Sequence, residues 1–299
     1  MAFPSDTFTS SDLAVMIPEI WGNRINDFFK CQLVMADFFV NRSDELVGGG
    51  DVLHTPNLTQ MSANTKTNGA AVTLNSPTET SQDLTVSTWE EVSFAIEDRE
   101  AAQVKQSYNI QERYAKNAGY TLGRTLEAAI AALFSSFSQS VGSSTTNIAD
   151  SDIRSAIATL ETNCVPREEL AFFMHPNVFW NQVQALDKFS LAINSPVNDP
   201  TSKYPDAFLY GIPVFTSNLI PNVSGANGFY NVLIHKDAIH WASLSLPVMT
   251  YGKGMVGAYN VRVQSSYIPD YLSTVTTADI CYGVIENRDN AGVKILTKA

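Results

Sequence analysis

The sequence predicts an α+β fold, and three observations lead to that prediction. One segment carries apolar side chains at helical spacing from Ile110 to Phe137, which indicates an unusually long amphipathic helix. Several shorter segments alternate or run apolar as strands do, without a regular strand–helix–strand rhythm. A polar stretch between two strand-like segments contains a tight-turn signal, which is typical of an extended hairpin.

Composition limits the classes of function. The chain has 299 residues, of which 44% are hydrophobic, enough for a sizeable core. Charged residues make up 16%, against about 25% in an ordinary globular protein. Much of the surface is therefore expected to be neutral or covered by a partner. The net charge of −11 and the absence of a Lys/Arg cluster argue against a general attraction to nucleic acid or anionic membranes.

Targeting and redox signals are sparse. The N-terminus lacks a basic region followed by an apolar stretch, and no apolar run is long enough to span a membrane. Three cysteines, Cys31, Cys164 and Cys281, lie far apart and without CxxC spacing. We expect buried free thiols rather than a disulfide framework or a zinc site.

The first expected element is a helix that begins near Pro18, a residue suited to the first helical turn. Apolar residues recur at helical spacing up to Phe29. From Leu33 the sequence favours extended structure. This N-terminal arm must lie either on its own body or on a neighbouring molecule, because its apolar residues would otherwise be exposed.

A hairpin of about 45 to 50 residues is expected next, and such a hairpin is only marginally stable alone. Its strands are predicted at 54–58 and 84–96, with the turn at Asn68-Gly69. Three consecutive glycines precede it, Gly48, Gly49 and Gly50. A phosphate-binding nest would need a helix immediately after the glycines, but a strand follows, so we interpret them as a hinge.

The long helix is predicted over 107–137, with Ser107 as its N-cap and a length of roughly 45 Å. Gly119 and Gly123 within it would permit close packing or a bend. The small polar segment 138–147 is expected to be a loop and the best domain boundary.

The remaining segments alternate between helix and strand. A capped helix is expected to start at Ser151 or Asp152. A second helix is expected over 177–186. Strands are expected at 169–176, 211–221, 229–242 and 258–268, and two more are joined by a turn at 289–292.

The search for an active site finds no catalytic, cofactor-binding or metal-binding constellation. Gly252, Gly254 and Gly257 match G-x-G-x-x-G, but a strand-like segment follows where a dinucleotide site needs a helix, so a mobile Gly-rich loop is the interpretation. The four histidines lack metal-ligand spacing. We therefore expect a protein that is not an enzyme and needs no cofactor. The alternatives left open are an enzyme with an unrecognised site in 146–270 and a carbohydrate-binding adhesin.

The order of these segments resembles the major capsid proteins of tailed bacteriophages with the HK97 fold. "IPEIWGNRINDFF" resembles the helix of their N-terminal arm. "GGGDVLHTPNL" through "STWEEVSFAIEDREAAQ" resembles their extended loop, the E-loop, and "QSYNIQERYAKNAGYTLGRTLEAAIAALF" their spine helix. "LETNCVPREELAFFMHPNVFWNQV" and "GIPVFTSNLIP" are similar to segments of their axial domain, and "ICYGVIENRDNAGVKI" to their closing strands.

The resemblance implies a division of the chain into an N-terminal arm, an E-loop hairpin, a peripheral domain with the spine helix, an axial domain and returning C-terminal strands. The corresponding ranges are 1–46, 47–98, 99–145, 146–270 and 271–299. The three glycines then become the hinge of the E-loop. Intersubunit contacts are implied for Trp21, Phe28, Lys66 and Trp89. Some relatives cross-link a loop lysine to a neighbour's asparagine, and Lys66 lies near the turn, but nothing in the sequence identifies an asparagine partner.

The resemblance also implies a function. Many copies would form the pentamers and hexamers of an icosahedral shell around double-stranded DNA, which the acidic chain would contact only weakly. The implied location is the virion, with assembly in the host cytoplasm and no membrane. The implied partners are a scaffolding protein and a portal, with a cement protein as an optional addition. Because the chain starts directly at the arm, a separate scaffold or prior cleavage is implied. The encapsulin-type shell, which encloses cargo enzymes, is the alternative.

Overall fold

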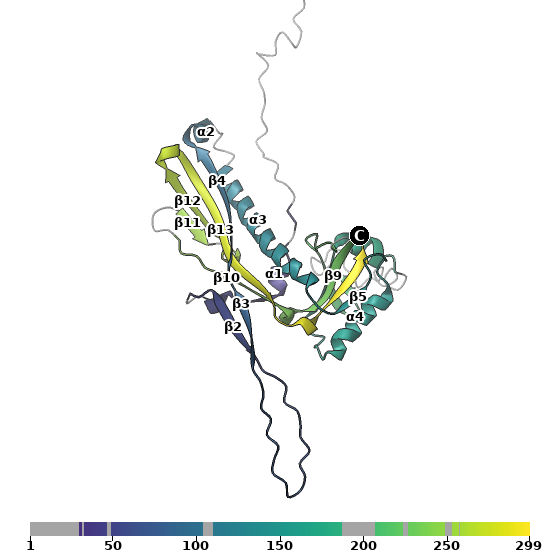
Figure 1. The fold of residues 1–299 in the computed structure, drawn as a ribbon. Helices are drawn as coiled ribbons and strands as arrows, with labels where there is room; N and C mark the ends of the chain where they lie inside the picture. Colours follow the sequence, from purple (N-terminus) through teal and green to yellow (C-terminus); the bar gives the residue numbers. More distant parts are fainter. Residues whose placement is uncertain are drawn as a thin grey trace, which may run out of the picture.

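The fold has an elongated part, a more compact part beside it and a hairpin that projects away from both (Figure 1). The computed structural model describes residues 30–31, 33–46, 49–103, 110–186, 207–223, 227–248, 253–256 and 258–299. Within them, no helix is long and apolar enough to cross a membrane. Ser107 and the helix expected near Pro18 lie outside the described residues.

The elongated part is built on the long strand β13 (Ser273–Glu286). The other strands of its sheet are β1 (Val40–Asn41), β4 (Thr88–Glu97), β10 (Ile239–Leu244), β11 (Lys253–Val256) and β12 (Arg262–Ile268). β13 is antiparallel to β4 along one edge. Along the other edge it pairs first with β12 and then, from Cys281 onward, with β10. β13 thus changes partner halfway along its length.

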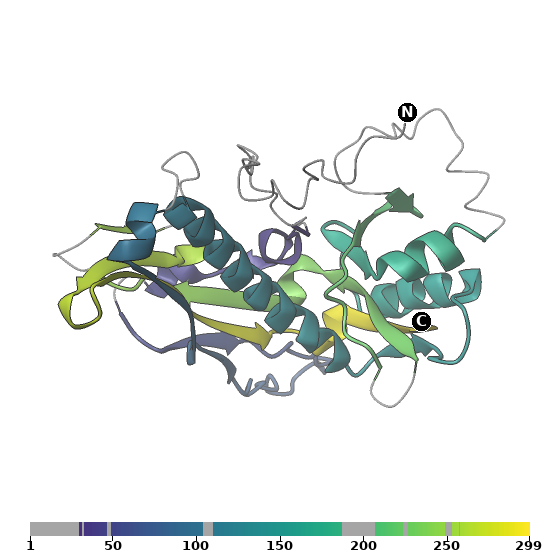
Figure 2. The ribbon, with the colours of Figure 1, turned by 90° about the horizontal axis from the view of Figure 1, so that it is seen from above.

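The predicted long helix is present as α3 (Ile110–Ala132), which lies along this sheet (Figure 2). Its predicted apolar row is buried at Ala118, Leu122, Leu126 and Ile130, whereas Tyr114 of the same row is 55% exposed. Gly123 does permit close packing, since a Cβ there would lie 3.0 Å from Leu33 Cδ1. The 3₁₀ turn η3 (Leu133–Ser135) ends the helix, and α2 (Asp98–Gln103) follows β4.

The segment from Leu33 is not simply extended as predicted. It forms the one-turn helix α1 (Met35–Phe38), then β1 and the 3₁₀ turn η1 (Ser43–Leu46). Helix formation buries Met35, Ala36 and Phe39 in the core. This part of the predicted arm therefore lies on its own body.

The compact part contains a second, mixed sheet, ordered β5-β14-β9-β6-β8-β7. Its strands are β5 (Ser140–Gly142), β6 (Leu170–Met174), β7 (Ala207–Leu209), β8 (Ile212–Thr216), β9 (Gly228–His235) and β14 (Gly292–Lys298). The segment 138–147 is therefore not merely a loop, because β5 pairs in parallel with β14. Gly142 allows this approach, since a Cβ there would lie 2.5 Å from the backbone oxygen of Leu296.

The helices of the compact part differ in detail from the prediction. α4 (Asp150–Thr162) has Ala149 as N-cap, not Ser151 or Asp152. The Asp152 side chain instead reaches back and accepts a hydrogen bond from the Ala149 amide at 3.0 Å. The second helix is shorter than expected and consists of α5 (Pro176–Val178) and the π turn η4 (Phe179–Val183).

The connections include the 3₁₀ turns η5 (Lys236–Ala238), η6 (Ala258–Asn260), η7 (Pro269–Tyr271) and η8 (Asp289–Ala291). The last of these joins β13 to β14 at the predicted turn. In the Gly-rich segment, residues 253–256 form strand β11 rather than a loop, and the next pairing element is the antiparallel strand β12. That arrangement does not offer the helix that a dinucleotide site requires.

The cysteine prediction is partly wrong. All three cysteines are free, but Cys31 and Cys164 are exposed and Cys281 is only partly buried. Cys164 lies just beyond α4 with a positive φ of 58°, at a turn on the surface. The position of a residue in a turn therefore outweighs the general tendency of free cysteine to be buried.

Candidate assembly surfaces

The projecting hairpin is the most exposed feature of the described chain. β2 (Val52–Asn57) pairs antiparallel with β3 (Thr80–Thr85), from Val52↔Thr85 to Asn57↔Thr80. The predicted turn is present, because the Ala70 amide donates to the Thr67 carbonyl at 3.2 Å and Gly69 has φ +80°. β2 begins before the predicted strand 54–58, and β3 begins at Thr80, before the predicted strand 84–96. The residues from Thr88 onward of that second predicted strand belong to the body sheet as β4.

Apolar side chains stand in the open on this hairpin. Leu58 and Leu74 are 84% and 86% exposed, and Met61 and Val72 are 65% and 67% exposed. Single apolar residues are common on protein surfaces, but this hairpin carries four, and no other part of the described chain covers them. Lys66 lies near the turn, where its ammonium group donates to the carbonyls of Thr67 and Ala70.

Two glycines shape the entry to the hairpin. Gly49 and Gly50 have φ values of +89° and +128°, a region that glycine adopts readily, and no atom would contact an added Cβ at either position. Gly48 lies outside the described residues. This geometry suits a hinge; movement about it stays a prediction.

The return side of the hairpin crosses β13 closely. The Val86 amide donates to the Asp51 carbonyl at 2.7 Å. This hydrogen bond joins the two sides of the hairpin at its base, which we call the hairpin root. A Cβ at Gly283 of β13 would lie 2.1 Å from the Thr85 backbone oxygen. Near this crossing lies a small hydrophobic core that is separate from the main one. It consists of Leu46, Leu84, Val86 and Ala242.

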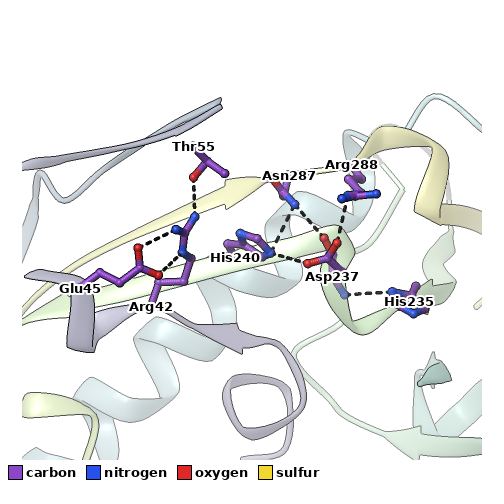
Figure 3. A network of polar contacts seen from close by, with 8 residues as sticks. All are labelled: Arg42, Glu45, Thr55, His235, Asp237, His240, Asn287 and Arg288. Carbon is purple, nitrogen blue, oxygen red and sulfur yellow. Dashed lines mark hydrogen bonds and ion pairs between the residues drawn. The ribbon is translucent and has the colours of Figure 1, made fainter. Parts of the chain in front are cut away.

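A polar network connects the N-terminal segment to the hairpin root (Figure 3). The Arg42 guanidinium donates to both carboxylate oxygens of Glu45 at 2.6 Å, and its third nitrogen donates to the Thr55 hydroxyl on β2. The hydrogen bond with Arg42 lowers the pKa of the Glu45 carboxyl group. Beside this group, His240 contacts Asp237 at 2.9 Å, and Arg288 contacts the same carboxylate at 3.0 Å.

Trp89 lies on β4, away from the hairpin tip that carries Lys66. Its indole is 66% exposed, but its Nε1 donates to the Asp279 carboxylate at 3.0 Å. Arg262 holds that carboxylate through two further bonds, at 2.9 and 2.5 Å. The ring is thus exposed but held in one orientation, which suits a residue that contacts a partner.

Of the residues expected to make contacts, Trp21 and Phe28 lie outside the described residues, and the fold does not bring Lys66 and Trp89 into one site. The sequence analysis did not identify Arg42. The pattern that could have indicated it is a basic residue, Arg42, three positions before an acidic one, Glu45, shortly before the three glycines.

The histidines have local structural roles. His175 stacks on Phe229 at 3.8 Å between ring centroids, and His54 pairs with Asp83 across the hairpin at 2.7 Å. Within the described ranges, no group of three or more His, Cys, Asp or Glu side chains is placed to hold a metal ion.

No protein-family model and no curated protein matches the sequence. Solved structures do match over nearly the whole chain. One from Mycobacterium phage Che8 has 18% identity and a TM-score of 0.72, covering 93% of this chain and 96% of that one. The capsid structure of cyanophage P-SCSP1u has 14% identity and a TM-score of 0.74, covering 99% and 97%. This chain has the fold of phage capsid subunits. The mature capsid of bacteriophage PhiM1 agrees, with 12% identity, a TM-score of 0.69, and coverage of 93% and 92%.

The capsid fold confirms the predicted α+β class, although it does not test each named part. The division into a peripheral range 99–145 and an axial range 146–270 stays a prediction. Strands β10, β11 and β12 fall in the second range by sequence, but they pair in the sheet of the elongated part.

Proposed function

We propose that this chain is the structural subunit of an icosahedral viral shell, which assembles as pentamers and hexamers around double-stranded DNA. The observation that carries the proposal is the hairpin segment 58–79, whose apolar side chains stand exposed on a chain with the capsid fold. We expect a neighbouring copy of the chain to bury these side chains, because every subunit of a symmetric assembly presents the same surface to its neighbour.

The energetics favour such cover. Burying one large aliphatic side chain contributes about 1.5–3 kcal/mol. Leu58 and Leu74 are almost fully exposed, so nearly all of that free energy is still available for association. In this proposal Trp21, Phe28, Lys66 and Trp89 contribute further contacts between subunits, and Gly48, Gly49 and Gly50 set the angle of the hairpin.

The negative net charge of the chain suits a subunit that encloses DNA rather than one that binds it tightly. With a net charge of −11, the subunit would contact packaged DNA weakly. The proposed location is the virion, after assembly in the host cytoplasm with a scaffolding protein and a portal, and with a cement protein as an optional partner. A shell around cargo enzymes is less favoured, because the similar solved structures include the capsids of cyanophages and of bacteriophage PhiM1.

The test is direct. The purified chain is concentrated, sedimented and viewed by negative-stain microscopy, and rings or closed particles are expected. A chain that stays monomeric at high concentration, with and without co-expressed scaffold, would overturn the proposal. Particles isolated from infected cells are then treated with nuclease. Protected double-stranded DNA supports the viral shell, whereas a packaged enzyme without DNA supports the alternative.

A further inference from the structure

A carboxyl group is buried where the N-terminal segment meets the long helix. Glu127 of α3 has no exposed surface. Its Oε1 accepts a hydrogen bond from the Ala36 amide at 2.7 Å, whereas its Oε2 has no hydrogen-bond partner among the described residues. Nor does any ion pair within the described ranges include Glu127. A buried carboxylate without a cation is costly, so the site calls for an explanation beyond packing.

The surroundings of Glu127 come mainly from the segment that covers it. The amides of Val34, Met35 and Ala36 favour the charged carboxylate, and the neighbouring charge of Asp37 opposes it. Desolvation is the largest effect, and it raises the pKa of the Glu127 carboxyl group. On the described chain, the titratable groups that face it are Asp37 from α1 and Tyr259 from η6, and the Tyr259 hydroxyl donates to Asp37 at 2.9 Å.

The covering segment is held at one residue, Ala36, from both sides. The amide of Ala36 donates to Glu127, and the carbonyl of Ala36 accepts from the Trp241 indole at 3.0 Å. Trp241 is itself almost fully buried on β10. Moving this segment away would therefore break contacts with both α3 and the sheet and would let water reach the carboxyl group.

We propose that Glu127 is a proton-linked latch for residues 33–41: the segment docks more tightly on α3 when the carboxyl group is protonated, and docking loosens when it is charged. The inference concerns a single chain and does not depend on shell formation.

The direction follows from linkage. The group binds a proton more readily when the segment is docked than when opening exposes it to water. The stabilisation is therefore fully present below the ordinary pKa of glutamate and is lost as the pH rises through the raised, docked-state pKa. One linked proton changes the opening equilibrium by at most about tenfold per pH unit.

The test is hydrogen exchange on the full chain, held in one assembly state that is checked by light scattering at each pH. Exchange of peptides covering 33–41 is measured from about pH 5 to about pH 8 and corrected for the intrinsic pH dependence of amide exchange. Glu127→Gln keeps an acceptor for the Ala36 amide but cannot be charged. Glu112→Gln, at an exposed position on the same helix, is the matched control.

In wild type and in Glu112→Gln, the opening constant of 33–41 is expected to rise with pH, by up to about tenfold per unit. In Glu127→Gln it is expected to stay flat and low. Equal pH dependence in wild type and Glu127→Gln would overturn the proposal. If Glu127→Gln does not fold, wild type alone decides, because the amides of β9 in the same sample provide an internal reference. The proposal would also be overturned if the opening constant of 33–41 rose with pH no more steeply than that of β9.

Discussion

Shortening the hairpin should separate folding from assembly. Asn57 and Thr80 are already opposite each other in the β2–β3 ladder. Replacing residues 58–79 by an Asn-Gly turn therefore joins two register partners with the two-residue loop that antiparallel strands accept best. The change removes the exposed apolar side chains and leaves the root with its small core intact.

The structure predicts a small change in the free energy of unfolding and a large change in the free energy of association. Leu58, Met61, Val72 and Leu74 are 65–86% exposed, so their removal should change the free energy of unfolding by no more than about 0.5 kcal/mol. For association, losing Leu58 and Leu74 alone would cost about 3–6 kcal/mol per contact if both become buried. That loss corresponds to a reduction in affinity of roughly a hundredfold or more.

The assay combines urea unfolding of the unassembled chain with negative-stain microscopy and sedimentation of the assembled material. An unchanged unfolding midpoint together with loss of particles is expected. The double variant Leu58→Asp/Leu74→Asp should behave in the same way. Thr65→Asp/Thr73→Asp adds the same charge to the same segment without removing apolar area, and it should assemble much better. Normal particles from the shortened chain would refute the reasoning.

Three further predictions concern the root and the sheet. Gly283→Ala should destabilise the chain by at least about 1–3 kcal/mol in urea unfolding, because the added Cβ would meet the last backbone oxygen of β3; an unchanged midpoint would contradict the crossing. Arg262→Ala should cost about 3–5 kcal/mol, since it leaves the buried Asp279 carboxylate without its cation, and Arg262→Lys should recover part of that loss. Arg42→Ala should speed hydrogen exchange around Thr55 without changing exchange in β14; uniform acceleration throughout the chain would argue against a local tie.

Local periodicity was enough to predict the elements that local physics determines. The row of apolar residues in α3 identifies its own secondary structure. The strand predicted over 258–268 is present only from Arg262 as β12, because Ala258–Asn260 form the 3₁₀ turn η6. The division between β3 and β4 could not be predicted in this way, because 84–96 reads as one strand and only pairing with β13 divides it. The short strand β5 was missed for the same reason, since its order depends on β14, far away in the sequence.

The candidate surfaces divide along similar lines. Gly49, Gly50 and the Asn68-Gly69 turn could be predicted because a positive φ favours particular residue types. The Arg42 network and the buried Glu127 could not, because whether a charged side chain is buried depends on what long-range packing brings over it. Glu127 and Ala36 are 91 positions apart. Nothing in the neighbourhood of either residue signals the other.

The order of strands has a consequence for synthesis on the ribosome. β13 lies in the middle of the first sheet, and β14, the last strand of the chain, lies between β5 and β9 in the second. Neither sheet can close until the C-terminal residues have emerged, although the hairpin is translated early. A nascent chain therefore cannot complete the first sheet before β13 has been synthesised or the second before β14, so both sheets form only after most of these residues have been translated.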